Sequence, residues 1–433
     1  MFKLPNFLKP TFLNKPSISN QAKPAALRFV LICVLLDVIG FGLIIPVLPS
    51  LIQEFTNGLP NSLSKQTIWY GVLMASYGFA QFIAAPFLGA LSDRYGRRSV
   101  LLISQVGWGL DFLLIAFAGS LPMMLIARVI GGITGAGFTV ASAYVADVTS
   151  VEKRTQGMGM IGAMFGLGFI IGPVVGGFLG DINIRLPFYV ATFIAFINVT
   201  YGYFILPESL PKEKRTAYTR RELMAKSNPF KSLIKLIYIP RTTYGISVSA
   251  LVAAVCLTNL AQFMMHTTFA LFTTQRYGWG AKDNGIALCV VGLIYAAIQG
   301  GLLGRLIKRF GEKHLAIIAM TIAMLEFIGF AFAVNGTQIY IAIVAAFLAS
   351  AAMPALMGLV SKTIGGNEQG NLMGMFTGLG ALMGVLAPLI ATPILAATNH
   401  FPANDPRFGT VYLCAALFQA ISVGLVCWAL RKS

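Results

Sequence analysis

The strongest constraint on the fold of this chain is a hairpin sequence of ten positions that occurs twice, once in each half. The first copy reads GALSDRYGRR over residues 89–98, and the second reads GRLIKRFGEK over residues 304–313. Each copy lies between long apolar segments, so each is expected to be a tight charged turn at a membrane face. A parallel repeat in a multi-span protein is typical of transporters that bind their substrate between two similar halves.

The composition places most of the protein surface against lipid. Hydrophobic residues make up 57% of the 433 residues and charged residues only 11%, whereas a soluble domain carries about 25% charged residues. Because about 20 apolar residues span a bilayer and a lipid-exposed span must satisfy its own backbone hydrogen bonds, we predict an all-α integral membrane protein. It should have twelve transmembrane helices in two pseudo-symmetric six-helix bundles. The expected spans lie near 27–52, 68–91, 99–118, 122–146, 156–180, 186–206, 243–273, 283–304, 313–333, 338–361, 369–396 and 408–430.

The predicted spans divide the chain into four parts. Residues 1–26 form a cytoplasmic N-terminal tail, and residues 27–206 form the first bundle. Residues 207–242 are a basic cytoplasmic linker, which we interpret as a solvated loop, and residues 243–433 form the second bundle.

The net charge of +17 suggests a nucleic-acid partner, but the distribution of the charge excludes one. With the N-terminus inside, the cytoplasmic segments hold 26 of the 32 Lys and Arg residues. This asymmetry follows the positive-inside rule and predicts a multi-pass protein of the cell inner membrane with both termini in the cytoplasm. The lipid bilayer is therefore the expected large-scale partner. The external loops are expected to hold only Lys65, Arg185, Arg276, Lys282 and Arg407.

The sequence contains no pattern for covalent or metal chemistry. All five cysteines fall in apolar segments without metal-ligand or disulfide spacing, so we interpret them as packing residues. No Ser–His arrangement or cluster of metal ligands is apparent. We therefore expect neither a metal nor a cofactor, and a secondary active transporter driven by the proton gradient rather than an enzyme.

Four charged residues stand out because they lie well inside predicted spans, away from the span ends: Asp37, Asp111, Arg128 and Glu326. A charge at mid-bilayer costs at least about 2–3 kcal/mol, so each is a candidate functional residue. At about 1.5 Å per residue, Asp37 lies about 15 Å and Asp111 about 18 Å from the cytoplasmic edge. Arg128 lies about 9 Å from the outer edge, near the level of Asp111 and within side-chain reach of Asp37.

The charged positions also follow the repeat. Glu326 follows Asp111 by the same offset that separates the two hairpin copies, and Pro388 follows Pro173 by that offset as well. A carboxylate that gains and loses an arginine partner can load and release a proton, because the arginine favours the charged form. The alternative is a static buried ion pair that only locks helices together. The sequence leaves both interpretations open for all four charges.

Several motifs resemble those of a known family, the major facilitator superfamily. Residues 89–98 resemble its signature loop, and residues 36–49 resemble the first-span motif of its twelve-span drug:proton antiporters. Residues 128–136 resemble the fourth-span motif of the same antiporters. The likeness is greatest to the tetracycline/proton antiporters. The residues that resemble the fifth-span antiporter motif are Gly168, Gly172, Pro173 and Gly176.

This resemblance implies a conformational latch at the first hairpin. It implies that Asp93 caps a neighbouring helix and pairs with arginines in the outward-facing state, which agrees with the attraction of an acid to a helix N-terminus. A basic loop that only sets the topology would explain Arg97 and Arg98 but not Asp93. Simple packing would explain any single glycine of the antiporter motif equally well. The implied latch residues are Gly89, Asp93, Arg94, Gly96, Arg97 and Arg98.

The second half departs from the tetracycline/proton antiporters. The eighth-span histidine of that family falls at Tyr295, its seventh-span glutamine at Asn259, and its ninth-span aspartate near Ala323. Polar groups within spans usually face the bundle interior, so substrate contacts are expected there, with plain interhelical hydrogen bonding as the alternative. The candidate substrate-binding residues are Asn259, Gln262, Tyr295 and Gln299.

Together these observations predict a proton-coupled antiporter that exports an amphipathic organic compound or drug by alternating access. Its partners would be a small organic substrate and protons, and it would function as a monomer. Two alternatives remain: an exporter of an endogenous metabolite such as a siderophore, and a membrane sensor that no longer transports.

Overall fold

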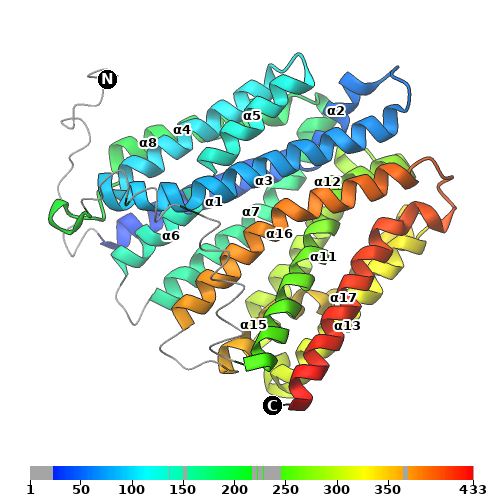
Figure 1. Cartoon of the computed structure of the whole chain (residues 1–433). Helices are drawn as coiled ribbons and strands as arrows, with labels where there is room; N and C mark the ends of the chain where they lie inside the picture. The colour runs from blue at the N-terminus through cyan, green and yellow to red at the C-terminus, as the bar shows by residue number, and fades with distance from the viewer. Residues whose placement is uncertain are drawn as a thin grey trace.

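The structure is a computed structural model that describes residues 23–135, 137–149, 154–216, 222, 228, 245–363 and 369–432. The regular elements of these residues are helices (Figure 1). Residues 1–22 of the predicted tail and most of the predicted linker lie outside this part of the chain, whereas residues 23–26 already belong to the first helix. Within the linker, residues 207–216 are described: Glu208 is buried and the Pro207 carbonyl accepts a hydrogen bond from Tyr144 of the first bundle, while Lys212, Glu213 and Thr216 are exposed.

The helices form two successive groups. The first half contains α1 (Lys23–Ile44), α2 (Leu48–Thr56), α3 (Ser62–Tyr95), α4 (Arg97–Ala116), α5 (Leu121–Thr134), α6 (Gly137–Val148), α7 (Arg154–Ile182) and α8 (Leu186–Ile205). The second half contains α11 (Gly245–Tyr277), α12 (Ala281–Ala297), a π-helical segment (Ile298–Leu302), α13 (Leu303–Phe332), α14 (Gly336–Ala345), a 3₁₀ turn (Phe347–Ala351), α15 (Ala352–Thr363), α16 (Gln369–Thr398) and α17 (Thr410–Lys432). Figure 1 shows the first half in blue to green and the second in green to red.

The described helices supply the twelve predicted spans. Ten stretches are long and apolar enough to cross a membrane, and the α14–α15 pair, bent by 49°, makes an eleventh. One of the ten, Ala281–Phe332, has 52 residues, more than twice the length of about 20 residues that a span needs. It breaks at Gly311 and therefore contains two spans.

The backbone repeats as the sequence predicts. Both hairpins turn at a glycine in the left-handed region, Gly96 with φ of 100° and Gly311 with φ of 72°, a conformation that any side chain would strain. Helices α7 and α16 contain internal proline at equivalent positions of the two halves, Pro173 and Pro388. The fourth span breaks near residue 135, and its counterpart breaks at the 3₁₀ turn of Phe347–Ala351.

Two boundary predictions were wrong. The apolar run 27–52 is not one span, because the chain turns at residues 45–47 and α2 continues as a separate nine-residue helix with Pro49 in its first turn. Arg276 is not an exposed loop residue. It lies on the last turn of α11 with 4% of its surface exposed, donates to the carbonyls of Ala331 and Ala403, and stacks on Phe272.

The molecule has two distinguishable ends. We call the end where α1 begins and α17 finishes the termini end, and the opposite end, which carries α2 and the loop before α17, the α2 end (Figure 1). Contacts between the halves run along two helix pairs, α3 with α16 and α7 with α12. Together with smaller contacts of α11 to α2 and α3, these two helix pairs form the interface between the halves.

Candidate functional site: buried charges and the interface between the halves

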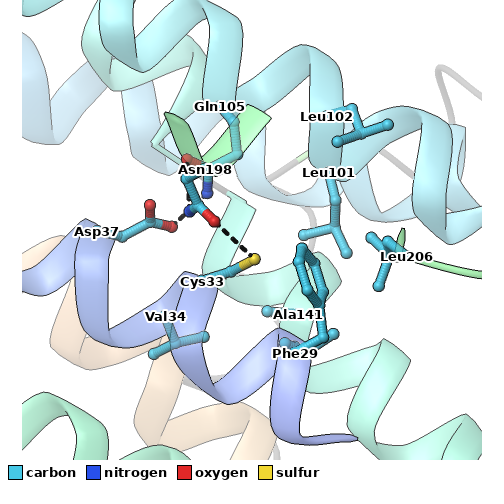
Figure 2. A pocket seen from close by; sticks show the side chains of 11 residues that line it. Phe29, Cys33, Val34, Asp37, Leu101, Leu102, Gln105, Ala141, Asn198 and Leu206 are labelled. Atoms are coloured by element: carbon cyan, nitrogen blue, oxygen red, sulfur yellow. Dashed lines mark hydrogen bonds between the residues drawn. The ribbon is translucent and has the colours of Figure 1, made fainter. Parts of the chain in front are cut away.

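Asp37 lies on α1 within the first half, facing α4 and α8 (Figure 2). Its Oδ2 accepts a hydrogen bond of 2.5 Å from Nε2 of Gln105 on α4. Oε1 of Gln105 in turn accepts a 3.5 Å bond from Nδ2 of Asn198 on α8. Among the described residues, the hydrogen bond to this carboxylate therefore comes from an amide and not from an arginine.

Asp111 and Arg128 form a buried ion pair between α4 and α5. Both are almost fully buried, at 0% and 2% exposed. The sequence placed Arg128 within reach of both acids, and the structure pairs it with Asp111 alone. The Arg128 guanidinium also lies 5.4 Å from the ring centre of Tyr77, and Gly131 on α5 leaves the space that the Asp111 carboxylate fills.

The pair is incompletely satisfied. Oδ1 of Asp111 and Nε of Arg128 are buried without a hydrogen-bond partner in the described structure. Tyr77 of α3 is close enough to interact electrostatically with Asp111, Arg128 and Asp37. The three charges are thus near neighbours, held by helices of one bundle.

The glycines of the predicted antiporter motif pack α7 against α1. A Cβ atom on Gly168 would lie 2.6 Å from Cβ of Val38, the residue after Asp37, and one on Gly172 would lie 2.7 Å from the carbonyl oxygen of Ile39. Gly176 meets the backbone of Leu43 in the same way. Their regular spacing by one helical turn puts these glycines on one face of α7, so they bring this helix into backbone contact with the helix that carries Asp37.

The next residues of α7 contact the other half. A Cβ on Gly177 would lie 2.7 Å from the carbonyl oxygen of Ala281 on α12, and one on Gly285 would lie 2.5 Å from that of Pro173. Pro173 and its neighbours therefore separate α1 on one side from α12 on the other. The motif is a junction between the Asp37 helix and the second half.

The contact between the halves loosens along the molecule. Gly292 of α12 still meets Ile170 of α7, but towards the termini end a Cβ on Gly166 or Gly300 would have no neighbour within 4 Å. Tyr295 and Gln299 lie one and two helical turns after Gly292, so they share its face, and both are exposed. These two candidate substrate residues therefore line the face of α12 where the two halves part.

The other candidates of the second half are placed apart. Asn259 and Gln262 are half-buried on α11, and no hydrogen bond between described residues joins them to Tyr295 or Gln299. Glu326 on α13 is also half-buried, and the described residues give it neither an ion pair nor a hydrogen bond. It differs in this from Asp111, its counterpart in the repeat.

A polar cluster that the sequence did not reveal joins the halves at the α2 end. Gln275 of α11 donates to Oε1 of Gln66 at 2.9 Å and to Oγ1 of Thr67 at 3.0 Å on α3. Asn399, just after α16, donates to Oγ1 of Thr67 at 3.1 Å, and Ser64 donates to Oδ1 of Asn399 at 3.1 Å. We call Ser64, Gln66, Thr67, Gln275 and Asn399 the interhalf cluster. Since single polar residues near helix ends carry no periodic signal, only their meeting across the interface identifies it.

The first hairpin forms an ion-pair network at the termini end. Arg97 pairs with Asp93 at 2.7 Å and with Asp147 of α6 at 3.2 Å. Its neighbour Arg98 is buried and donates to the carbonyl of Tyr203 on α8 at 2.6 Å. Arg98 therefore ties α4 to α8 in addition to setting topology. The side chains at the start of α16 lie outside the described residues. Contacts of Asp93 with that part of the second half are therefore not described.

Glu208 supplies a helix cap that the sequence did not predict. Its carboxylate is 4% exposed, accepts the Arg97 backbone N–H at 2.9 Å and pairs with Arg215 at 3.4 Å. A Cβ on Gly96 would collide with this carboxylate, so the glycine serves both the turn and the cap. The acid at the start of α4 is thus Glu208, while Asp93 pairs within the hairpin.

The site contains buried titratable groups and polar contacts at a movable interface, which suits proton and solute movement. The described residues contain no group of His, Cys, Asp and Glu side chains arranged to hold a metal ion.

Comparison with known proteins agrees with this architecture. The sequence model described as Major Facilitator Superfamily matches residues 30–388. The chain is 36% identical to the Tetracycline resistance protein, class C, of Escherichia coli, over 86% of this chain and 90% of that protein. It is 30% identical to Multidrug resistance protein 2 of Bacillus subtilis, over 91% and 93% of the two chains. Its fold is similar to that of a bacterial homologue of the human lysosomal transporter Spinster, solved in an inward-facing, unoccupied conformation, with a TM-score of 0.73, 14% identity, and 96% and 98% coverage.

Proposed function

The chain belongs to the major facilitator superfamily and is a secondary transporter, not an enzyme; from this premise we propose that it exports an amphipathic drug in exchange for protons, with Asp37 as the proton carrier. The observation that carries the proposal is the position of Asp37. Asp37 lies on α1, and the glycines of α7 pack closely against α1. Helix α7 also contacts α12 of the second half. A proton taken up by Asp37 therefore changes the charge on the helix that packs against α7, and α7 forms the interface with α12.

The proposed transport cycle follows from the two ends of the interface. The contacts of the interhalf cluster hold the α2 end closed, while the α7–α12 contact loosens towards the termini end. With both termini in the cytoplasm, as the positive-inside distribution favours, this arrangement corresponds to an inward-facing state. Opening requires the cluster to separate and the hairpin network of Asp93 and Arg97 to rearrange. Rocking of one bundle against the other is the usual route of such transporters.

The roles of the other charges follow from their surroundings. Asp111 and Arg128 form a pair whose unsatisfied atoms favour a change of partner when a neighbouring charge changes, because unpaired buried polar groups are costly. Glu326 has no cationic partner in the described residues, so we assign it to the recognition of positive charge on a substrate. Tyr295 and Gln299 are assigned to the substrate surface at the opening between the halves.

The substrate class rests on the relatives. The proteins similar to this chain over most of its length include tetracycline resistance proteins and multidrug resistance proteins. Because Tyr295 stands where the resemblance to the tetracycline/proton antiporters implies a histidine, we propose an amphipathic organic drug as the class and tetracycline as its first member to test. The transporter would act as a monomer in the inner membrane, with the proton gradient as its energy source and no cofactor.

The deciding experiment is transport by the purified protein in proteoliposomes. An imposed pH gradient should drive concentrative movement of tetracycline or of a lipophilic cation, with a counterflow of protons measured by an internal pH dye. D37N should abolish both signals. Proton-independent movement by the unchanged protein would refute coupling. A drug panel in an efflux-deficient host would separate drug export from export of an endogenous metabolite, since only the former raises resistance.

A further inference from the structure

Behind Asp37, a chain of side-chain hydrogen bonds crosses the core of the first half (Figure 2). Sγ of Cys33 donates to Oδ1 of Asn198 at 3.0 Å, Nδ2 of Asn198 donates to Oε1 of Gln105 at 3.5 Å, and Nε2 of Gln105 donates to Oδ2 of Asp37 at 2.5 Å. The chain links α1, α8 and α4 and returns to α1. It has Asp37 at its accepting end.

With Asp37 ionised, and therefore only an acceptor, the chain has one consistent direction. An amide group has a donating and an accepting end, and a thiol is a weak donor. Since Asn198 donates to the Gln105 oxygen, Gln105 must turn its N–H groups towards Asp37. Asn198 is fixed in the same way, because its oxygen accepts from Cys33. Each amide thus orients the next one, and the last one presents a donor to the carboxylate.

The surroundings leave the amides few other partners. Gln105 is 6% and Asn198 is 1% exposed. Beside them lies a cavity of about 10 Å³, whose other lining residues, apart from Cys33 and Asp37, are apolar: Phe29, Val30, Val34, Leu101, Leu102, Ala141 and Leu206. This is on the order of the space for one water molecule. An amide without its partner here would remain unsatisfied, which strengthens the preference for the observed arrangement.

The titratable groups near Asp37 are few among the described residues. Cys33 lies one turn away on α1, and Tyr144 of α6 lies near Cys33. From α3, α4 and α5, Tyr77, Asp111 and Arg128 approach the same region. The described contacts of α7 with α1 are made by glycines, Pro173 and the ring of Phe169. The hydrogen-bonding influence on the carboxylate therefore comes from two amides, Gln105 through its 2.5 Å bond and Asn198 beside it.

We propose that Gln105 and Asn198 are positioning residues of the proton-coupling site: Gln105 holds the ionised Asp37 carboxylate in place, and Asn198 orients Gln105 and lies beside the same carboxylate. The proposal rests on the proposed function of Asp37 as proton carrier. A hydrogen bond to the charged form of an acid favours that form. The chain therefore stabilises the state after proton release and weakens when Asp37 takes up the next proton.

The proposal is tested by the pH profile of proton-driven export in proteoliposomes, measured for Q105L, N198L and the double variant. Without the donor, Asp37 retains its proton to higher pH, so the pH of half-maximal export on the alkaline side should rise by about one unit in Q105L, the scale of one charge-assisted hydrogen bond. N198L should shift it in the same direction by less. Because both amides act on the same carboxylate, the double variant should shift at least as far as Q105L.

Two controls separate the possible outcomes. Q419L removes an equally buried amide, whose Nε2 donates to the Met320 carbonyl in the second half, and should leave the pH profile unchanged. Substrate counterflow without a pH gradient should persist in Q105L. Where Q105L fails to fold, Q105M preserves the length and volume of the side chain and lacks the donor.

The proposal is overturned if the profile of Q105L keeps its position and only its amplitude falls. This result with an inactive D37N would refute the positioning role and leave the proposed function standing. Coupled export by D37N would instead remove the proposed function itself.

Discussion

The interhalf cluster predicts that one substitution at the α2 end changes the balance between the two conformations. In Q275L the leucine has a similar volume but donates nothing to Gln66 and Thr67. An intramolecular hydrogen bond contributes about 0.5–1.5 kcal/mol net, so the loss of the two donated bonds alone costs the closed α2 end about 1–3 kcal/mol. The loss of the bond that Oε1 of Gln275 accepts from Asn399 at 3.2 Å acts in the same direction. This corresponds to about a 5- to 150-fold shift in the conformational equilibrium.

The loss acts on one state only. Gln66 is 2% and Thr67 0% exposed in the closed arrangement, whereas water can satisfy both once the halves separate. A substitution changes an equilibrium only through such a difference between the states. Q275L should therefore increase the population of the form that is open at the α2 end.

The measurement is single-molecule energy transfer between dyes on unnatural amino acids at positions 59 and 404, so that the native cysteines remain. Leu59 and Asn404 are exposed at the α2 end of the first and second half, respectively. Q275L should enlarge the long-distance population by at least about fivefold relative to the unchanged protein. The matched control is Q53L, since Gln53 is exposed on α2 at the same end. An unchanged distribution in Q275L, or the same change in both variants, refutes the assignment of the cluster as the contact that closes this end.

Three further predictions concern the charged residues. D37N should abolish proton-driven export, because the carboxamide cannot take up and release a proton, while membrane insertion and substrate counterflow stay intact. Transport in vesicles with and without a pH gradient checks this. Concentrative export by D37N contradicts it. D93N removes the acid that the family resemblance implies pairs with arginines in the outward-facing state. It should therefore lower turnover and raise the inward-facing population, with substrate affinity roughly kept. The same dye pair and a binding titration check this, and a parental distribution of states would count against it. E326Q should lose export of a lipophilic cation and keep export of a neutral compound, because the carboxylate attracts the cation and the carboxamide does not. Efflux measured for one compound of each kind decides this. Equal loss of both would assign Glu326 to general coupling or folding.

The sequence was sufficient for the architecture because span length and the repeat of the hairpin depend on local composition. The turn at Gly96 and its counterpart at Gly311 were confirmed together with the helical spans. The α1–α2 break escaped prediction because the run 27–52 is continuously apolar, so hydropathy gives no sign of the turn at residues 45–47. The burial of Arg276 could not be predicted, because its partners are backbone carbonyls and aromatic rings, which no charge pattern in the sequence indicates.

The site was harder to predict than the fold, since depth along a helix does not fix the direction of a side chain. Arg128 lies at a depth where either acid could be its partner, and only the rotation of α4 and α5 selects Asp111. The amide partners of Asp37 were overlooked because Gln105 and Asn198 are 93 residues apart and each is an ordinary polar residue in its own span. The interhalf cluster joins α3 to residues of the other half of the chain, a separation at which one sequence alone carries no pairing information.

The placement of α7 gives a physical reason why proton uptake and movement of the halves should be linked. Gly168 holds α7 against Val38, beside Asp37, and the Pro173 carbonyl oxygen faces Gly285 on α12. Contacts this close leave little space to absorb a shift, and packed interfaces change between discrete arrangements more readily than they deform. If α1 shifts when Asp37 is protonated, α7 must either move with α1 or lose contact with it. Either response alters the contact between α7 and α12. We infer that the antiporter glycines serve export by making the contact between the proton-carrying helix and the interface stiff.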